Sequence, residues 1–171
     1  MSIRLETQRL ILRKPTIDDV PAEAEFYASD RARFVGGKMS RELVWRTMAM
    51  VIGHWDMRGY GYFAIEEKSS GDYAGRVGCW YPDGWPEPEF SWCLMGNHEG
   101  KGLAFEAAKA VRNWAYSDLG WTTAVSMIDP ANVRSEALAK RLGAEFAYDF
   151  DHERYGKCNV WRHAGPKVVI E

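Results

Sequence analysis

Hydrophobic and polar residues alternate along the N-terminal segment 4–15. The alternation places Leu10 and Leu12 on one side of an extended chain and Arg9 and Arg13 on the other. A period of two is the pattern of a half-buried strand, and a proline closes this one. We therefore predict that the chain opens with a β-strand.

The next two segments have the spacing of helices. Residues 16–29 begin with Thr16, a residue type that caps helix N-termini, and two aspartates follow near the positive end of the helix. Residues 40–59 place apolar side chains three and four positions apart, between Ser40 as N-cap and Gly59 as the C-terminal stop. Two consecutive helices are expected.

The remaining segments alternate between extended and helical patterns. The expected strands cover 60–68, 72–81, 89–95, 121–128, 144–150 and 158–164, and the expected helices cover 102–119 and 132–143. This mixed order predicts a single domain over residues 1–171, with one central sheet and helices on its faces. The strand–helix–strand unit at 89–128 predicts a parallel strand pair joined by a right-handed crossover.

Composition and charge narrow the classes of partner. The 171 residues are 46% hydrophobic and 27% charged, and the net charge is -2 at pH 7. Charge therefore gives no reason to expect nucleic acid or an anionic membrane as a partner. The charged N-terminus and the absence of a long apolar run lead us to expect a cytoplasmic protein. The three cysteines and four histidines lack disulfide or metal-ligand spacing, so we expect no metal.

Two glycines stand directly before a predicted helix, in the sequence EGKGLA at residues 99–104. The first amides of a helix have no partner within it and attract anions, and glycine lets a phosphate approach the backbone. Lys101 adds a positive charge nearby. The stretch lacks the residues of a Walker loop or of a dinucleotide fingerprint. It is typical either of a plain turn between strand and helix or of a site for a diphosphate.

The context of this stretch resembles the GNAT superfamily of acetyl-CoA-dependent N-acetyltransferases, and within it the ribosomal-protein N-terminal acetyltransferase (RimJ/RimL-like) branch. The diphosphate motif of the family matches at Gly102 and Ala104, whereas Glu99 stands where the family has Gln or Arg. Further similar segments are ETQRLILRKPTIDD, GRVGCW, EFSWCL and DPANVRSEALAKRLGA, in the family's order. The resemblance implies a mixed α/β fold with a mostly antiparallel seven-stranded sheet, a parallel strand pair at the cofactor cleft and helices on both faces.

The resemblance also implies which residues bind the cofactor. The backbone of the fourth family strand bonds the pantetheine arm, the glycine loop holds the diphosphate, and the next helix contributes two polar side chains. The residues that match are Cys93, Leu94, Met95, Glu99, Gly100, Lys101, Gly102, Leu103, Ala104, Asn132 and Ser135. Asn132 is equally explained as the N-cap of its helix.

Two residues are candidates for the chemistry itself. Glu89 lies on the strand at 89–95, shares a strand face with Ser91 and Cys93, and matches the position where the family has a carboxylate base. Water alone is the alternative base for an α-amine. In this branch a serine matching Ser135 lies near the cofactor sulfur. Trp85, in the rigid sequence WPEP, is a weak candidate for substrate contact.

The predicted function is therefore acetyl transfer from acetyl-CoA to a primary amine by direct attack in a ternary complex. The acceptor is either a protein N-terminus or a small-molecule amine, and the protein is a monomer or a homodimer. The alternative is a CoA-binding or acyl-CoA-sensing module without catalysis, which needs neither Glu89 nor Ser135. An acyl-cysteine route through Cys93 is disfavoured, because no histidine lies nearby in the sequence to activate a thiol.

Overall fold

Eight strands form one mixed sheet in the computed structural model, which describes residues 3–166. The spatial order of the strands is β1-β2-β3-β4-β5-β6-β8-β7. The strands are β1 (Leu5–Glu6), β2 (Leu10–Arg13), β3 (Tyr62–Glu67), β4 (Tyr73–Trp80), β5 (Glu89–Leu94), β6 (Val125–Ile128), β7 (Glu145–His152) and β8 (Gly156–Arg162). The α-helices are α1 (Val20–Ala28), α2 (Arg41–Arg58), α3 (Leu103–Ser117) and α4 (Val133–Arg141), and the 3-10 turns are η1 (Ile17–Asp19), η2 (Asp30–Phe34) and η3 (Gly96–His98).

The predicted order of elements is confirmed, with one difference in the count of strands. The N-terminal segment predicted as one strand is divided into β1 and β2, because the Thr7 N–H donates to the Leu10 carbonyl at 3.0 Å and closes a turn. The sheet therefore has eight strands instead of seven. β6 is also shorter than predicted and begins at Val125.

The predicted helix boundaries follow from local capping. The Ser40 hydroxyl accepts a hydrogen bond from the Leu43 N–H at 3.3 Å at the start of α2, and Gly59 ends that helix with a φ of 78°. At the start of η1 and α1, the Thr16 N–H donates to Asp19 at 2.8 Å. None of the helices described between residues 3 and 166 is long and apolar enough to cross a bilayer.

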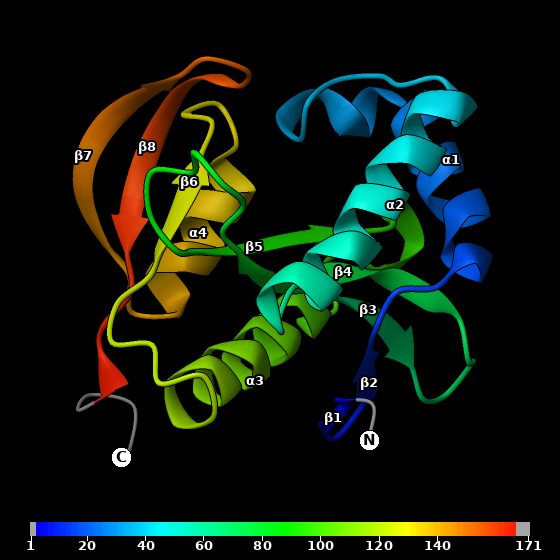
Figure 1. Ribbon diagram of the computed structural model, residues 1–171, viewed down its shortest axis with the longest axis horizontal. Coiled ribbons are helices and arrows are strands. Elements are labelled where there is room, and N and C mark those ends of the chain that lie inside the picture. The colour runs from blue at the N-terminus through cyan, green and yellow to red at the C-terminus, as the bar shows by residue number, and fades with distance from the viewer. Residues whose placement is uncertain (1–2, 167–171) are drawn as a thin grey trace.

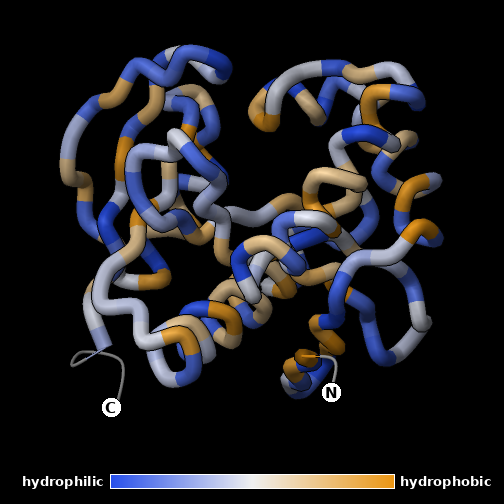
Figure 2. Tube along the Cα trace, in the orientation of Figure 1, coloured by the Kyte–Doolittle hydropathy of each residue, from blue (hydrophilic) through white to orange (hydrophobic). Residues whose placement is uncertain are grey.

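Two apolar clusters pack on the central strands. The larger joins α3 to β2, β3 and β4, and includes Leu10, Leu12 and Phe63, all fully buried. The second joins α1 and α2 to Cys93 and Met95 of the β5 region. Figure 2 shows that the connecting tip of the β7–β8 hairpin is hydrophilic, unlike these packed segments. Because side chains of a strand point alternately to its two faces, the β5 side chains are divided between the surroundings of these two clusters.

β5 occupies the centre of the molecule and marks where the sheet opens. Figure 1 shows β5 running between a part formed by β1–β4, α1 and α2 and a part formed by β6–β8 and α4. β5 and β6 are parallel, as predicted, but they pair only at Glu89 and Val125. Beyond that pair the two strands separate, and among the described strands β5 is then paired with β4 alone.

Candidate active site

The separation of β5 from β6 leaves backbone groups of β5 facing an opening. The Met95 N–H donates to the Ala74 carbonyl at 2.9 Å, and the β4–β5 register pairs Cys93 with Arg76. Because backbone groups of successive residues point to opposite sides of an antiparallel strand, those of Trp92 and Leu94 point away from β4. These backbone groups are available to an extended ligand laid beside β5.

The N-terminus of α3 lies beside this open edge. Gly100 and Gly102 have φ values of 74° and 78°, a left-handed conformation that other residues adopt only with strain. Gly102 is the N-cap of α3, and no side chain of the described residues 3–166 caps the helix there. The first amides of α3, from Leu103 onward, are therefore directed toward the space in front of the helix.

Asn132 and Ser135 form the opposite side of the opening, at the start of α4. The Asn132 side-chain oxygen accepts a hydrogen bond from the Ser135 N–H at 3.3 Å, so Asn132 is an N-cap. The Ser135 hydroxyl oxygen in turn accepts a hydrogen bond from the Trp92 indole N–H at 3.3 Å. This bond ties α4 to β5 across the opening and fixes the position of the hydroxyl.

Together these elements line a cavity of about 970 Å³, here called the cofactor cleft. The predicted cofactor residues that line it are Cys93, Leu94, Glu99, Gly100, Gly102, Leu103, Ala104, Asn132 and Ser135. Met95 and Lys101 are not among the lining residues. Met95 is buried in the α1–α2 cluster, and the exposed Lys101 has its carbonyl bound by Arg9 at 2.8 Å.

Glu99 is held by two arginines at this cleft. One carboxylate oxygen contacts the Arg31 guanidinium, and the other accepts from Arg134 at 2.8 Å. Arg31 belongs to η2 and Arg134 to the first turn of α4, and all three side chains line the cofactor cleft. The residue that departs from the family motif is therefore paired with cations from two other elements.

A second cavity of about 380 Å³, here called the acceptor cavity, also lies against β5. Glu89, Ser91 and Cys93, which were predicted to share a strand face, line it from β5 together with Trp92. Its walls are rich in aromatic rings, namely Tyr27, Phe34, Tyr62, Trp80, Trp85, Trp92 and Tyr155. The two cavities share the wall formed by Arg33, Phe34, Val35, Trp92 and Cys93.

Glu89 is buried, and two donors hold its carboxyl group. One oxygen accepts from the Trp85 indole N–H at 2.9 Å, and the other accepts from the Met127 N–H at 3.1 Å. Burial raises the pKa of Glu89 to about 8, and the two hydrogen bonds oppose that rise without cancelling it. A carboxyl group that titrates near neutral pH in a cavity is suited to accept a proton.

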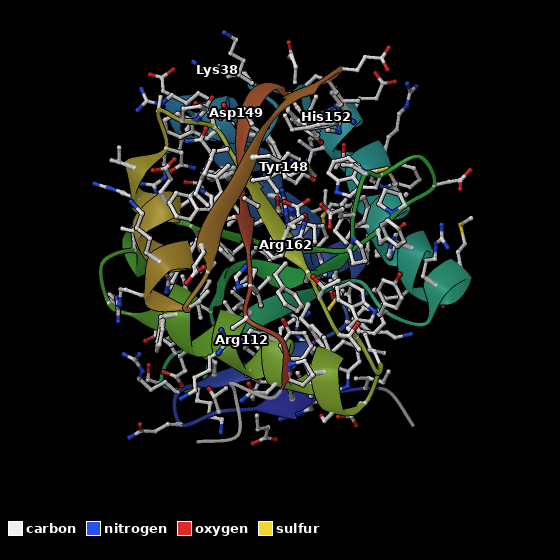
Figure 3. The ribbon with its side chains drawn as sticks, turned by 90° about the vertical axis from the view of Figure 1, so that its left-hand side faces the viewer. Lys38, Arg112, Tyr148, Asp149, His152 and Arg162 are labelled. Carbon is white, nitrogen blue, oxygen red and sulfur yellow. The ribbon has the colours of Figure 1, made fainter. Side chains whose placement is uncertain are left out.

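The β4–β5 loop, which carries Trp85, is fixed to the last two strands. Glu87 accepts hydrogen bonds from both terminal nitrogens of Arg162 at 2.9 Å and from the Tyr148 hydroxyl. Arg162 on β8 and Tyr148 on β7 are labelled in Figure 3, which views the molecule from the β7–β8 side. This connection holds the indole of Trp85 where it can bond Glu89.

Two further ionisable groups line the acceptor cavity, but neither is in a reactive state. Burial raises the pKa of the Cys93 thiol to about 12, so the thiol is not ionised near neutral pH. The guanidinium of Arg76 is buried and paired with the carboxylate of Glu23, so its charge is compensated. Within residues 3–166, no three His, Cys, Asp or Glu side chains are grouped as metal ligands.

The model of the GNAT acetyltransferase domain matches residues 9–145 of the sequence, which include both sides of the cleft. The chain belongs to the GNAT acetyltransferase family. The crystal structure of an acetyltransferase from Agrobacterium tumefaciens is similar to this GNAT protein, with 34% identity, a TM-score of 0.87 and 95% of each chain covered.

Two solved structures of lower sequence identity share the fold. A GNAT-family acetyltransferase from Bacillus anthracis aligns with a TM-score of 0.80 at 16% identity, over 95% of this chain and 98% of that one. The ribosomal L7/L12 α-N-protein acetyltransferase RimL, solved with coenzyme A, aligns with a TM-score of 0.78 at 16% identity, over 95% and 98%. The uncharacterized protein YkkB of Bacillus subtilis is 26% identical over 102 residues, which are 55% of this chain and 59% of YkkB. The match therefore spans less than two thirds of YkkB.

Four residues of the site were not predicted from the sequence. Trp92 bonds Ser135, the Met127 N–H bonds Glu89, and both Arg31 and Arg134 contact Glu99. In the sequence, Trp92 is typical of a core residue, and Arg31 is typical of a solvated surface. A backbone N–H cannot be recognised from the residue type. The one indication in the sequence was the acidic residue at position 99, where the family has Gln or Arg. A carboxylate at that position predicts nearby cations.

Proposed function

We propose that this protein transfers an acetyl group from acetyl-CoA to a primary amine in a ternary complex. The observation that carries the proposal is the arrangement of two cavities that share the wall at Trp92 and Cys93. Glu89 lines only the acceptor cavity and Ser135 only the cofactor cleft. A thioester and an amine that enter from opposite sides would therefore meet beside β5.

In the proposed reaction the amine nitrogen attacks the thioester carbonyl carbon. A carbon–nitrogen bond forms, the carbon–sulfur bond breaks, and the sulfur leaves as a thiolate. The amine gives up a proton to a base, and the thiolate gains one. An outward-pointing N–H of Trp92 or Leu94 would stabilise the negative charge that develops on the carbonyl oxygen.

Glu89 is proposed as the base that accepts the proton of the amine. An α-amino group has a pKa of about 7.7–8.0, close to the pKa of about 8 for Glu89. Proton transfer between groups of similar pKa carries little free-energy cost. At pH 7 only about a tenth of Glu89 is ionised, so activity should rise with pH up to and above 8.

Ser135 is proposed as the donor to the departing sulfur. Its oxygen already accepts the Trp92 N–H, so its own O–H is free to point into the cleft. A donor at the sulfur stabilises the thiolate as it forms. The proposed roles of Asn132 and the glycine loop are to bind the pantetheine arm and the diphosphate.

The walls of the acceptor cavity favour an amine attached to an apolar or aromatic body. Tyr62, Trp80 and Trp85 line the cavity close to Glu89, and rings of this kind bind flat apolar groups. RimL acts on a protein N-terminus, as its name states. The proposal therefore includes both small amines and the N-terminus of a protein as acceptors.

The test is an assay of CoA release from acetyl-CoA with a panel of amines and peptides, the products being identified by mass spectrometry. We expect N-acetylated product with at least one amine bearing an apolar body. A protein that binds acetyl-CoA but acetylates no member of the panel is a CoA sensor, and the proposal is then wrong. A protein that binds neither CoA nor acetyl-CoA also contradicts the sensor alternative.

A further inference from the structure

The carboxylate of Glu99 joins three elements around the cofactor cleft. It contacts Arg31 of η2 with one oxygen and Arg134 of α4 with the other, the latter at 2.8 Å, and it directly precedes the glycine loop. Arg31 packs against Gly96, where an added Cβ would lie 3.2 Å from the guanidinium nitrogen Nη1. In this arrangement two arginines that line the cleft, from two different elements, share one carboxylate.

A diphosphate in front of α3 would meet this arrangement directly. Glu99, Gly100 and Gly102 all line the cleft, as do Arg31 and Arg134. A carboxylate at the edge of an anion site repels a phosphate, and this one already pairs with two guanidinium groups that line the cleft. A glutamine or arginine at position 99 would produce neither effect.

We infer that Glu99 competes with the diphosphate of coenzyme A for the two arginines and so weakens the binding of coenzyme A to the enzyme. In the free protein Glu99 pairs with Arg31 and Arg134. When the cofactor binds, its diphosphate takes over hydrogen bonds from these arginines, and Glu99 returns to them when CoA leaves. The inference rests on the proposed use of acetyl-CoA.

Such competition has a kinetic consequence for the enzyme. The same diphosphate belongs to the substrate acetyl-CoA and to the product CoA, so Glu99 weakens the binding of both. Product release limits turnover in many enzymes. Glu99 therefore raises the KM for acetyl-CoA and speeds the release of CoA, so it sets how long the product stays bound.

The experiment compares the binding of CoA and of pantetheine to the wild type and to Glu99→Gln by calorimetry. Pantetheine has the arm that lies along β5 but lacks the diphosphate. We expect Glu99→Gln to bind CoA about fivefold to tenfold more tightly, because the competing charge is gone, and to bind pantetheine as the wild type does. The exposed Glu25 has no hydrogen bond or ion pair among residues 3–166, and Glu25→Gln, with the same change of charge, is the control.

The steady-state kinetics give an independent measurement. Glu99→Gln should lower the KM for acetyl-CoA, and its kcat should stay equal or fall, because CoA leaves more slowly. Weaker or unchanged CoA binding by Glu99→Gln, with the fold intact by circular dichroism, would mean that Glu99 only positions the arginines, and the inference is then wrong. Equal tightening of pantetheine binding also contradicts it, because the effect would not act through the diphosphate.

The failure of this inference can be told apart from the failure of the proposed function. A wild-type protein that binds no CoA refutes both. A wild type that binds CoA and acetylates amines, combined with a Glu99→Gln variant that binds CoA less tightly, refutes only the role of Glu99. Arg134→Gln removes a positive charge instead of a negative one. It should weaken the binding of CoA but not of pantetheine.

Discussion

The two cavities that meet at β5 are lined by different parts of the chain. The predicted binding groups of the cofactor cleft are concentrated in two short segments, at 99–104 and 132–135, although η2 and β5 also line it. The acceptor cavity depends on side chains from segments far apart in the chain, including α2, β3, the β4–β5 loop and the β7–β8 hairpin. A short loop is formed by neighbours in the sequence, whereas a cavity lined by scattered segments is formed only when the tertiary structure brings those segments together.

The largest effect is expected from Glu89→Gln, which alters only the acceptor side. The amide has no basic oxygen of comparable strength, so kcat at pH 7 should fall about 100-fold, within the usual range for removal of a general base. The affinity for CoA, measured by calorimetry, should stay near that of the wild type. Glu25→Gln is again the control, and unchanged turnover in Glu89→Gln would eliminate Glu89 as the base.

The pH dependence of stability gives the next largest effect. The pKa of Glu89 is about 8 in the folded protein and about 4.3 when unfolded, so between these values the folded state binds more protons. The contribution of Glu89 to stability is complete below about pH 4.3 and is lost as the pH rises through 8.

Glu89→Gln has no such titration. Its free energy of unfolding, relative to that of the wild type, should therefore increase by about 2 kcal/mol between pH 6 and pH 8. Urea titrations of both proteins at several pH values measure this difference. A difference that does not change with pH would show that Glu89 is ionised throughout the range.

A smaller effect is expected from Gly102→Ala on the cofactor side. With a φ of 78°, an alanine strains the start of α3 by about 1 kcal/mol, although its Cβ meets only Arg9 at an ordinary 3.5 Å. Because this strain displaces the first amides of α3, the affinity for CoA should fall about tenfold. Gly53→Ala, in the middle of α2 with nothing within 4 Å, is the matched control and should stabilise the protein slightly. Equal CoA affinity in the two variants would contradict the diphosphate site.

The smallest effect is expected from Ser135→Ala. Removal of one donor to the leaving sulfur should lower kcat by about threefold to tenfold, with little change in CoA affinity. Ser135→Thr keeps a hydroxyl at this position and should restore most of the activity. If threonine fails to restore what alanine removes, the loss reflects the broken contact to Trp92 and not a hydroxyl donor.

The sequence by itself determined the order of the elements and the conformation of the loop proposed to bind the diphosphate. Periodicity and caps such as Ser40 and Gly59 act within a few residues, so the order of strands and helices could be predicted from the chain alone. The glycine loop was recognisable for the same reason, because the conformations of Gly100 and Gly102 and the amides of α3 are local properties.

Only the tertiary structure decided how these pieces meet. The pKa of Glu89 depends on burial together with Trp85 and the backbone of Met127, and the pairing of Glu99 depends on Arg31 and Arg134. Burial and charge pairing are set by distances between segments that are remote in the chain. A sequence pattern describes neighbours along the chain, and these interactions arise only when the sheet brings distant segments together.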